Sequence, residues 1–392
     1  MTHKASEDGK AGSLAESQAV VVGAGAFGGW TALHLQESGV QTTLVDAWGP
    51  GHGLSSSGGE TRVLRCGYGQ LSLYAEMALR ARRMWQEREE RWGVELLHQR
   101  PILWIGHEDD PLLRGSQQCF DQLGLPYNRL SAARIQERFP DFRCGDEVVG
   151  LLEHQAGVLY ARRACRVVAD AFQEAGGVLL RGRAKAPAGS GSLKVLELDD
   201  GRRLKADTYL FACGPWMASL FDRYLEDRLE ITRQEVFFFG PPPAHPMLDE
   251  RGGQDCRLPV FYDASMDSYY GIPPLQGRGF KLASDLAGPV VDPQGDSRQS
   301  SPEALRGARD FLKKRLPVLA HAPLSESRVC VYTRTPDRHF VMGPHPRISN
   351  VFLAGGGSGH GFKHGPLVGE YAAAMMSKNR PFPSQWRLDR LL

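Results

Sequence analysis

Residues 18–48 read QAVVVGAGAFGGWTALHLQESGVQTTLVDAW, a sequence in which two short apolar runs enclose a helical pattern. The run Ala19–Val22 predicts a buried strand, and the apolar spacing that follows it predicts a helix. Gly39 suits the end of that helix, because glycine accepts the left-handed backbone found there. The second run, Thr43–Val45, predicts another strand, which ends on Asp46. The stretch therefore predicts a β-strand, an α-helix and a second parallel β-strand.

The turn between the first strand and the helix carries three glycines in the spacing of a dinucleotide-binding motif. Gly23 permits the tight turn, Gly25 lets the backbone approach a pyrophosphate, and Gly28 lets the helix pack close to the sheet. Asp46 lies about 20 residues further on, where an acid holds a ribose hydroxyl. A glycine turn of an ordinary α/β protein is the alternative. The motif favours dinucleotide binding without distinguishing NAD from FAD.

A second glycine cluster lies near the end of the chain. Residues 350–370 read NVFLAGGGSGHGFKHGPLVGE, in which an apolar strand, Val351–Ala354, runs into glycines and a helix begins near Pro366. Glycines after a strand indicate a backbone that lies close to a ligand, although a flexible loop would have the same composition. The chain also has no second dinucleotide-binding fingerprint that could serve a nicotinamide cofactor. These two observations favour FAD over NAD.

The rest of the chain divides into two kinds of segment. Residues 159–182 predict an amphipathic helix, a Gly-Gly stop and a strand, and residues 192–214 predict a hairpin with an Asp-Gly turn. The remaining segments hold short strands, prolines and turns. We therefore expect an α/β (α+β) protein in which a Rossmann-like FAD-binding domain is interrupted by an antiparallel-sheet substrate domain. The expected bounds are 18–96, 156–225 and 325–392 for the first domain, and 97–155 and 226–324 for the second.

Composition excludes several classes of protein. The 392 residues carry a net charge of +2 and no polybasic block, so neither nucleic acid nor a membrane surface is an expected partner. No apolar stretch is long enough to span a bilayer. Residues 1–17 are polar and predict a disordered tail. Seven cysteines without CxxC or Cys/His clusters favour a cytoplasmic protein without disulfides or a metal site.

Five stretches, in this order, resemble the monomeric sarcosine oxidase and N-methyl amino acid oxidase group of flavin-dependent amine oxidases, within the D-amino-acid-oxidase-like flavoproteins. They are VVGAGAFGGW (21–30), GGETRVLR (58–65), YYGIPPLQGRGFKL (269–282), VCVYTRTPDRHF (329–340) and GSGHGFK (357–363). The resemblance covers nearly all of the chain after the tail. It implies a monomer that oxidises an amino acid and passes the electrons to dioxygen.

The resemblance also implies which residues hold the flavin. Cys330 would form a thioether to the C8 methyl group of FAD; an inert buried cysteine is the alternative. Arg62 would lie against the flavin ring, beside Thr61. The remaining implied contacts come from the last stretch: Gly359, His360, Gly361 and Lys363.

Other residues are implied to act on the substrate or on dioxygen. Arg65 and Lys363 would hold the substrate carboxylate, which suits the charge-assisted hydrogen bonds that such cations form. Lys281 would activate dioxygen, because a fixed cation stabilises developing negative charge. Without a flavin, the arginines would be a surface pair and Lys281 a strand lysine with its head in solvent. Tyr270 and Tyr332 would line the pocket.

Two positions depart from the family pattern, since sarcosine oxidases carry histidines where this chain has Gly58 and Asp285. We expect Gly58 to open space and Asp285 to replace an imidazole with an anionic acceptor. Both changes favour a substrate larger than sarcosine that bears a donor or a cation. Within the family, cyclic imino acids and glycated amino acids are alternatives. An NAD-dependent dehydrogenase and a non-enzymatic redox-sensing flavoprotein are the alternatives outside it.

Overall fold

A computed structural model describes residues 14–392, apart from 244, 246–247, 249–257 and 378–380. The chain forms two compact units. The first draws its described residues from Met1–Glu60, Ala161–Glu230 and Thr333–Leu392. The second comprises Thr61–Tyr160 and Ile231–Tyr332, again without the residues excluded above. The units divide the chain at other residues than the expected domains do, because residues 61–96, 156–160 and 325–332 belong to the second unit and residues 226–230 belong to the first.

The first unit is built on a mainly parallel sheet. Its described strands follow the order β17-β18-β11-β1-β2-β9, and β10 pairs with β11. Neighbours from β18 to β9 run parallel, whereas β17 and β10 are antiparallel to their partners. The strands are β1 (Leu14–Val22), β2 (Thr42–Asp46), β9 (Val178–Arg181), β10 (Leu196–Glu197), β11 (Arg203–Phe211), β17 (Val341–Pro344) and β18 (Val351–Gly355).

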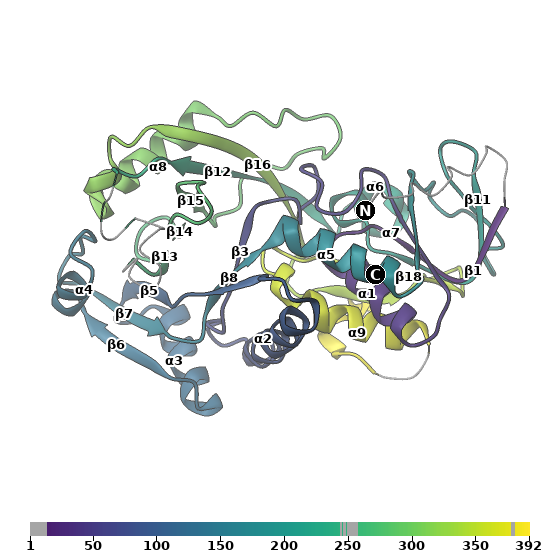
Figure 1. Cartoon of the computed structure of the whole chain (residues 1–392), viewed down its shortest axis with the longest axis horizontal. Coiled ribbons are helices and arrows are strands. Elements are labelled where there is room, and N and C mark those ends of the chain that lie inside the picture. Colours follow the sequence, from purple (N-terminus) through teal and green to yellow (C-terminus); the bar gives the residue numbers. More distant parts are fainter. Residues whose placement is uncertain (1–13, 244, 246–247, 249–257, 378–380) are drawn as a thin grey trace. The chain divides into compact units, whose positions relative to one another are not determined.

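The helices of this unit are α1 (Ala26–Glu37), α5 (Ala161–Glu174), α6 (Met217–Leu220), α7 (Asp222–Leu225) and α9 (Gly365–Met376). Short 3₁₀ turns are η1 (Gly214–Trp216), η4 (Phe362–His364), η5 (Ser384–Trp386) and η6 (Leu388–Leu391). The purple α1 and the yellow α9 come from opposite ends of the chain and lie side by side (Figure 1). A glycine permits this approach: a Cβ at Gly369 would lie 2.6 Å from Trp30 Cβ and 2.7 Å from its carbonyl carbon.

These elements confirm the local patterns. The predicted strand, helix and second strand are β1, α1 and β2, and residues 159–182 contain α5, a turn at Gly176 (φ +91°) and β9. The predicted hairpin joins β10 to β11. The expected tail was too long, because Leu14–Ser17 already belong to β1 and pair with β11. The backbone N–H and C=O groups of the long β11 pair with those of this polar segment. Hydropathy could not indicate this pairing. Residues 1–13 lie outside the described residues.

The second unit contains a mixed sheet and a smaller antiparallel sheet. The larger sheet follows the order β16-β12-β15-β14-β13-β5-β7-β6, in which β13 and β5 pair in parallel. The smaller sheet has the order β3-β8-β4. Strands of the larger sheet are β5 (Ile102–His107), β6 (Tyr127–Ser131), β7 (Val148–Glu153), β12 (Glu230–Phe239), β13 (Val260–Asp263), β14 (Tyr269–Ile272), β15 (Phe280–Ser284) and β16 (Leu324–Arg334). Those of the smaller sheet are β3 (Thr61–Leu64), β4 (Leu97–Gln99) and β8 (Gly157–Tyr160).

Helices α2 (Ser72–Trp92), α3 (Pro111–Leu123), α4 (Ala132–Arg138) and α8 (Pro302–Arg315), with η3 (Pro317–Leu319), complete this unit. Its core holds stacked aromatic rings, including Phe261, Phe280 and Phe311. The mixed α/β fold agrees with the expected class. In the described part of the chain, every helix is too short or too polar to cross a bilayer.

Candidate active site

The glycines of the first motif lie where a larger residue would meet backbone. Gly23 has φ +105°, and a Cβ there would lie 2.4 Å from the carbonyl oxygen of Ala212. A Cβ at Gly28 would lie 1.9 Å from the Gly23 carbonyl oxygen. A Cβ at Gly25 would meet only the side chain of Ser57, with the hydroxyl at 3.3 Å. The turn is therefore tight where strand and helix meet, and Gly25, the residue before α1, has a side chain rather than backbone beside it.

Asp46 and Ser57 hold this turn in place. One carboxylate oxygen of Asp46 accepts a hydrogen bond from Ala24 N at 2.8 Å, and the other accepts from the backbone of residues 48 and 49. The Ser57 hydroxyl accepts from Ala26 N at 3.1 Å and so caps α1 from a distant part of the chain. Asp46 thus orders the motif. Its role toward a ribose hydroxyl stays a prediction.

The C-terminal glycine cluster lies next to the first motif. Gly356, Ser358 and Gly359 have positive φ angles of +65°, +45° and +82°. A Cβ at Gly361 would lie 2.9 Å from the ring of Phe27 on α1. Both glycine-rich turns therefore meet at the N-terminal end of α1, where backbone N–H groups and the helix dipole favour an anion. Such a pair of turns fits the pyrophosphate of a dinucleotide.

Lys363 and His360 follow this turn, within the first unit. The Lys363 side chain is 4% exposed, and its Nζ donates to the His360 carbonyl oxygen at 3.2 Å. Arg65 belongs to the second unit. The prediction that Lys363 and Arg65 share one carboxylate therefore stays a prediction.

Cys330 lies on β16, in the second unit, and is paired with a cation. Arg62 Nη2 donates to the Cys330 sulfur at 3.5 Å, and the sulfur lies 3.8 Å from the Val331 carbonyl oxygen. Like the other described cysteines, Cys330 is a free thiol. The arginine that the sequence singled out as a flavin contact thus lies against the candidate anchor.

Two tyrosines lie beside this pair. The phenols of Tyr270, on β14, and Tyr332, on β16, share a hydrogen bond. Burial raises the pKa of Tyr270 to about 12, and Asp285 and Cys330 contribute to the rise while Arg62 opposes it. Burial also raises the pKa of Tyr332 well above its usual value, with Tyr270 and Asp285 as further causes. Both phenols therefore stay protonated at neutral pH and can donate hydrogen bonds.

Lys281 is buried in β15, with 4% of its surface exposed. Its Nζ donates to the Thr61 carbonyl oxygen at 3.0 Å, lies 3.3 Å from the Thr61 hydroxyl and lies 5.6 Å from the centre of the Tyr270 ring. The alternative of a strand lysine with its head in solvent is therefore wrong. A buried ammonium costs free energy unless polar partners surround it, which favours a functional position.

Arg65 lies over two aromatic rings. Its guanidinium carbon is 4.5 Å from the centre of the Tyr68 ring and 4.8 Å from that of Trp104. The guanidinium also donates to the Gly67 carbonyl oxygen. Within the described residues, Arg65 forms no ion pair. Stacking fixes the plane of the guanidinium and leaves donors for a carboxylate.

The sequence did not indicate what supports Arg65. Glu153 is buried at the end of β7 and accepts hydrogen bonds from Cys66 N at 2.7 Å, Gly67 N at 3.2 Å and Trp104 Nε1 at 3.1 Å. Burial raises the pKa of Glu153, and these hydrogen bonds together with the charge of Arg65 oppose the rise. The sequence signal that could have indicated Glu153 is an acidic residue at the end of an apolar strand.

Gly58 does not open space, contrary to expectation. A Cβ there would lie 1.8 Å from the His52 carbonyl oxygen, so backbone already fills the position. The Gly58 carbonyl accepts from Arg162 Nη2 at 2.9 Å, which ties the segment to α5. The glycine therefore permits a close backbone contact, and the argument for a larger substrate depends on Asp285 alone.

A parallel sheet that brings two glycine-rich turns to one helix N-terminus is typical of a dinucleotide-binding protein. Residues 18–375 match the family described as FAD dependent oxidoreductase, and the chain belongs to that family. Within it, the chain is an oxidase of the sarcosine oxidase and N-methyl amino acid oxidase type. The choice between NAD and FAD is thus answered in favour of FAD.

Three similar proteins illustrate this membership. The chain is 30% identical over 357 residues to monomeric sarcosine oxidase of Bacillus sp. (strain B-0618), with 90% of both chains covered. It is 26% identical over 370 residues to N-methyl-L-tryptophan oxidase of Yersinia pestis (strain Pestoides F), covering 93% of this chain and 95% of that one. A fructosyl peptide oxidase structure, a thermally stable mutant, covers 95% and 93% of the two chains at 21% identity, with a TM-score of 0.82, and shows the fold.

Proposed function

We propose that the protein oxidises the C–N bond of a secondary or N-substituted amino acid to an imine, with dioxygen reduced to hydrogen peroxide. Bound FAD would supply the two-electron acceptor for this reaction. The observation that carries the proposal is a chain of contacts within one unit: Arg62 lies against Cys330, Tyr270 and Tyr332 lie beside this pair, and Lys281 lies 5.6 Å from the Tyr270 ring.

In this proposal, each of these residues of the second unit has its own role in binding the substrate or in the reaction. Arg65, stacked over Tyr68 and Trp104, would hold the substrate carboxylate in a fixed plane. The protonated phenols of Tyr270 and Tyr332 would donate hydrogen bonds and exclude water from the reacting carbon. Lys281 would place a positive charge where negative charge develops on dioxygen.

The first unit would hold the dinucleotide part of FAD. The turns around Gly25 and Gly359 would receive the pyrophosphate. The glycines themselves have no side chain that would cover the backbone near the helix N-terminus. Cys330 would form a covalent bond to the flavin, as the sequence predicts. The Arg62 guanidinium, 3.5 Å from the Cys330 sulfur, supports this role, because the sequence also predicts that Arg62 lies against the flavin ring.

Asp285 points to the substrate class. It follows β15, and its backbone N–H donates to the Ser268 carbonyl at 2.9 Å, which continues the pairing of β15 with β14. Strand alternation therefore places Asp285 on the face of Lys281, beside Tyr270. An anion at this place favours an amino acid whose side chain carries a cation or a hydrogen-bond donor. A cytoplasmic location and a monomeric state stay predictions.

Hydrogen peroxide release from a substrate panel tests the proposal. The panel contains N-methyl amino acids with cationic, neutral and anionic side chains, cyclic imino acids, glycated amino acids and the matching amines without a carboxylate. We expect the cationic N-methyl amino acids to react fastest, and the Asp285→Asn variant to lose that preference about tenfold, as the loss of one charge-assisted contact predicts. The proposal is wrong if no carboxylated amine bleaches the flavin under anaerobic conditions.

A further inference from the structure

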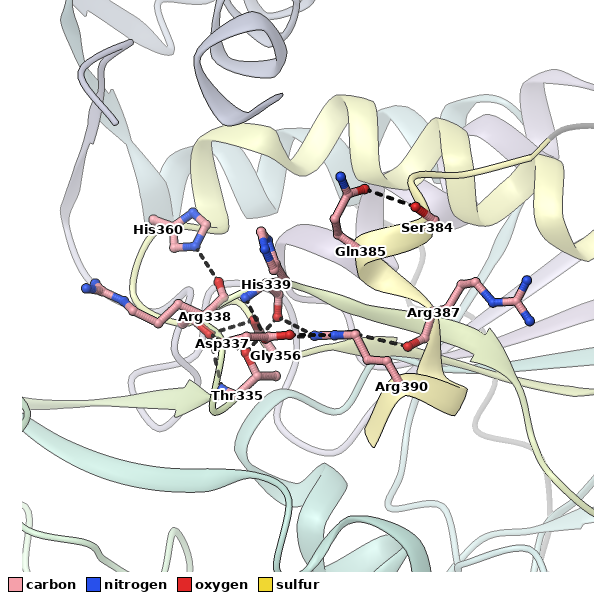
Figure 2. A network of polar contacts seen from close by, with 11 residues as sticks. Thr335, Asp337, Arg338, His339, Gly356, His360, Ser384, Gln385, Arg387 and Arg390 are labelled. Atoms are coloured by element: carbon pink, nitrogen blue, oxygen red, sulfur yellow. Dashed lines mark hydrogen bonds and ion pairs between the residues drawn. The ribbon is translucent and has the colours of Figure 1, made fainter. Parts of the chain in front are cut away.

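The turn between β16 and β17 contacts the C-terminal glycine cluster through its backbone. The ring Nε2 of His360 lies at hydrogen-bond distance, 3.0 Å, from the carbonyl oxygen of Arg338 (Figure 2). The His360 ring also stacks on Phe340, with 4.9 Å between ring centres. Thr335 Oγ1 donates to the His339 carbonyl at 2.7 Å and closes the turn. The position of His360 is therefore tied to residues 335–340.

The end of the chain holds the same turn from another direction. Arg390 Nε and Nη2 contact the two carboxylate oxygens of Asp337 at 2.8 and 3.1 Å, and Nη2 also donates to the His339 carbonyl at 3.1 Å (Figure 2). Such bidentate pairs fix both distance and plane. The Arg390 side chain is 18% exposed and that of Asp337 is 40% exposed, so the guanidinium is the better shielded partner of the pair.

Apolar packing supports this ion pair. Trp386, in η5, is fully buried, and its ring lies 5.2 Å from that of Phe340 and 5.6 Å from that of Tyr371 on α9. Phe340 in turn lies 5.3 Å from Phe27 of α1. Residues 384–391 thus contact the turn through a ring and a guanidinium, and the turn contacts both the glycine cluster and α1.

We propose that residues 384–391 are a positioning element for the cofactor, in which Arg390 holds the turn at Asp337–His339 and the turn holds His360 and the glycine cluster in the geometry that receives FAD. The inference rests on the proposed function, because it assigns the cluster to FAD. Arg390 touches no reacting atom and acts through the backbone of the turn. Its loss removes one of the contacts that hold this turn, so the cost falls on the position of His360 and on FAD binding.

Arg387 provides a matched control three residues away. Its side chain is 62% exposed and bonds only to Asp389, two residues along the same segment. Replacing Arg387 removes the same charge from the same segment without touching the turn. A difference between the two positions therefore reports the contact to the turn and not the charge.

The test is made in full-length protein carrying Cys330→Ala, so that FAD exchanges. FAD is titrated into the apoproteins of Arg390→Met, Arg390→Lys and Arg387→Met, at a temperature where circular dichroism shows each one folded. The dissociation constant is read from the quenching of flavin fluorescence. We expect Arg390→Met to weaken FAD binding by about tenfold or more, the loss of one or two charge-assisted contacts. Arg390→Lys should recover part of the loss, and Arg387→Met should lie within about twofold of the parent.

Equal dissociation constants for the two methionine variants would overturn the inference and leave the proposed function intact. A parent protein that takes up no FAD would overturn both. The comparison separates positioning from stability, because the dissociation constant is measured on folded apoprotein and a merely structural role of Arg390 would leave it unchanged.

Discussion

Gly28→Ala tests whether the first glycine turn must be as tight as the structure has it. The added methyl group would lie 1.9 Å from the Gly23 carbonyl oxygen and 3.2 Å from Ala212 Cβ. Contacts of a Cβ shorter than 3.0 Å are essentially never found, so α1 and the turn must separate by at least 1.1 Å. Gly23 has little freedom to move, because its N–H donates to the Val45 carbonyl at 2.7 Å.

The magnitude follows from two opposing effects. Overpacking of this kind costs about 1–3 kcal/mol, and contact with backbone on a paired sheet places the cost near the upper end. Alanine in the first turn of a helix recovers up to about 1 kcal/mol relative to glycine. We expect the free energy of unfolding to fall by about 2 kcal/mol, which lowers Tm by about 4–8 °C for a unit of this size. Because the turn itself moves, FAD uptake should weaken as well.

Gly29→Ala is the matched control on the next residue. The nearest atom to its added Cβ is Val168 Cγ1 at 3.6 Å, an ordinary van der Waals distance. This variant should unfold at the parent temperature or slightly above it, because alanine favours the helix. Thermal unfolding of both apoproteins by circular dichroism, with FAD titration of each, makes the comparison. The reasoning is refuted if both variants unfold at the same temperature and bind FAD alike.

Two further predictions concern the second unit. Intact-mass spectrometry of denatured protein should show a flavin adduct that Cys330→Ala abolishes; bare polypeptide mass from a protein fully loaded with flavin would exclude the covalent bond. In stopped-flow measurements, Lys281→Met should leave anaerobic flavin reduction by substrate largely intact and slow reoxidation by about a hundredfold, as the loss of about 3 kcal/mol of electrostatic stabilisation implies. If reduction fails instead, Lys281 serves substrate binding rather than dioxygen.

Local patterns in the sequence predicted much of the first unit. The strand at Ala19–Val22, the helix after Gly28 and the turn at Gly176 depend on apolar period and on glycine, and both act over a few residues. The hairpin around Gly201 is equally local. Such features can be predicted because the residues that determine them are neighbours in the chain.

Membership of a sheet could not be predicted in the same way. Thr61–Leu64 pairs with Gly157–Tyr160, nearly 100 residues away, and so belongs to the second unit. Leu324–Arg334 joins the larger sheet beside Glu230–Phe239. An apolar run predicts a strand without naming its partner, so the expected domain bounds departed from the units at these segments.

The candidate site shows the same division between local and distant signals. Resemblance indicated Arg65 and Lys281 by their place in motifs, and the structure supplied their surroundings. Trp104 and Glu153 support Arg65 from strands that follow it by about 40 and 90 residues. Gly58 was misinterpreted because the backbone at His52, which fills its Cβ position, leaves no trace in the pattern of side chains.

In the proposed function, the larger sheet of the second unit carries the lysine for dioxygen and the acid for substrate choice at separate positions. Lys281 lies inside β15, where Phe238 and Ile272 pair with it on either side, so few substitutions would keep its ammonium against Thr61. Asp285 lies on the same face but beyond the last residue of β15, where a side chain can change without disturbing the ladder. A change at position 285 should therefore alter which amine is accepted and leave reoxidation by dioxygen intact. Asp285→His, which introduces the residue that the sequence resemblance implies for sarcosine oxidases, should shift the preference toward smaller, uncharged substrates while the stopped-flow reoxidation rate stays the same. A slower reoxidation would show that the two functions are not separable along this strand.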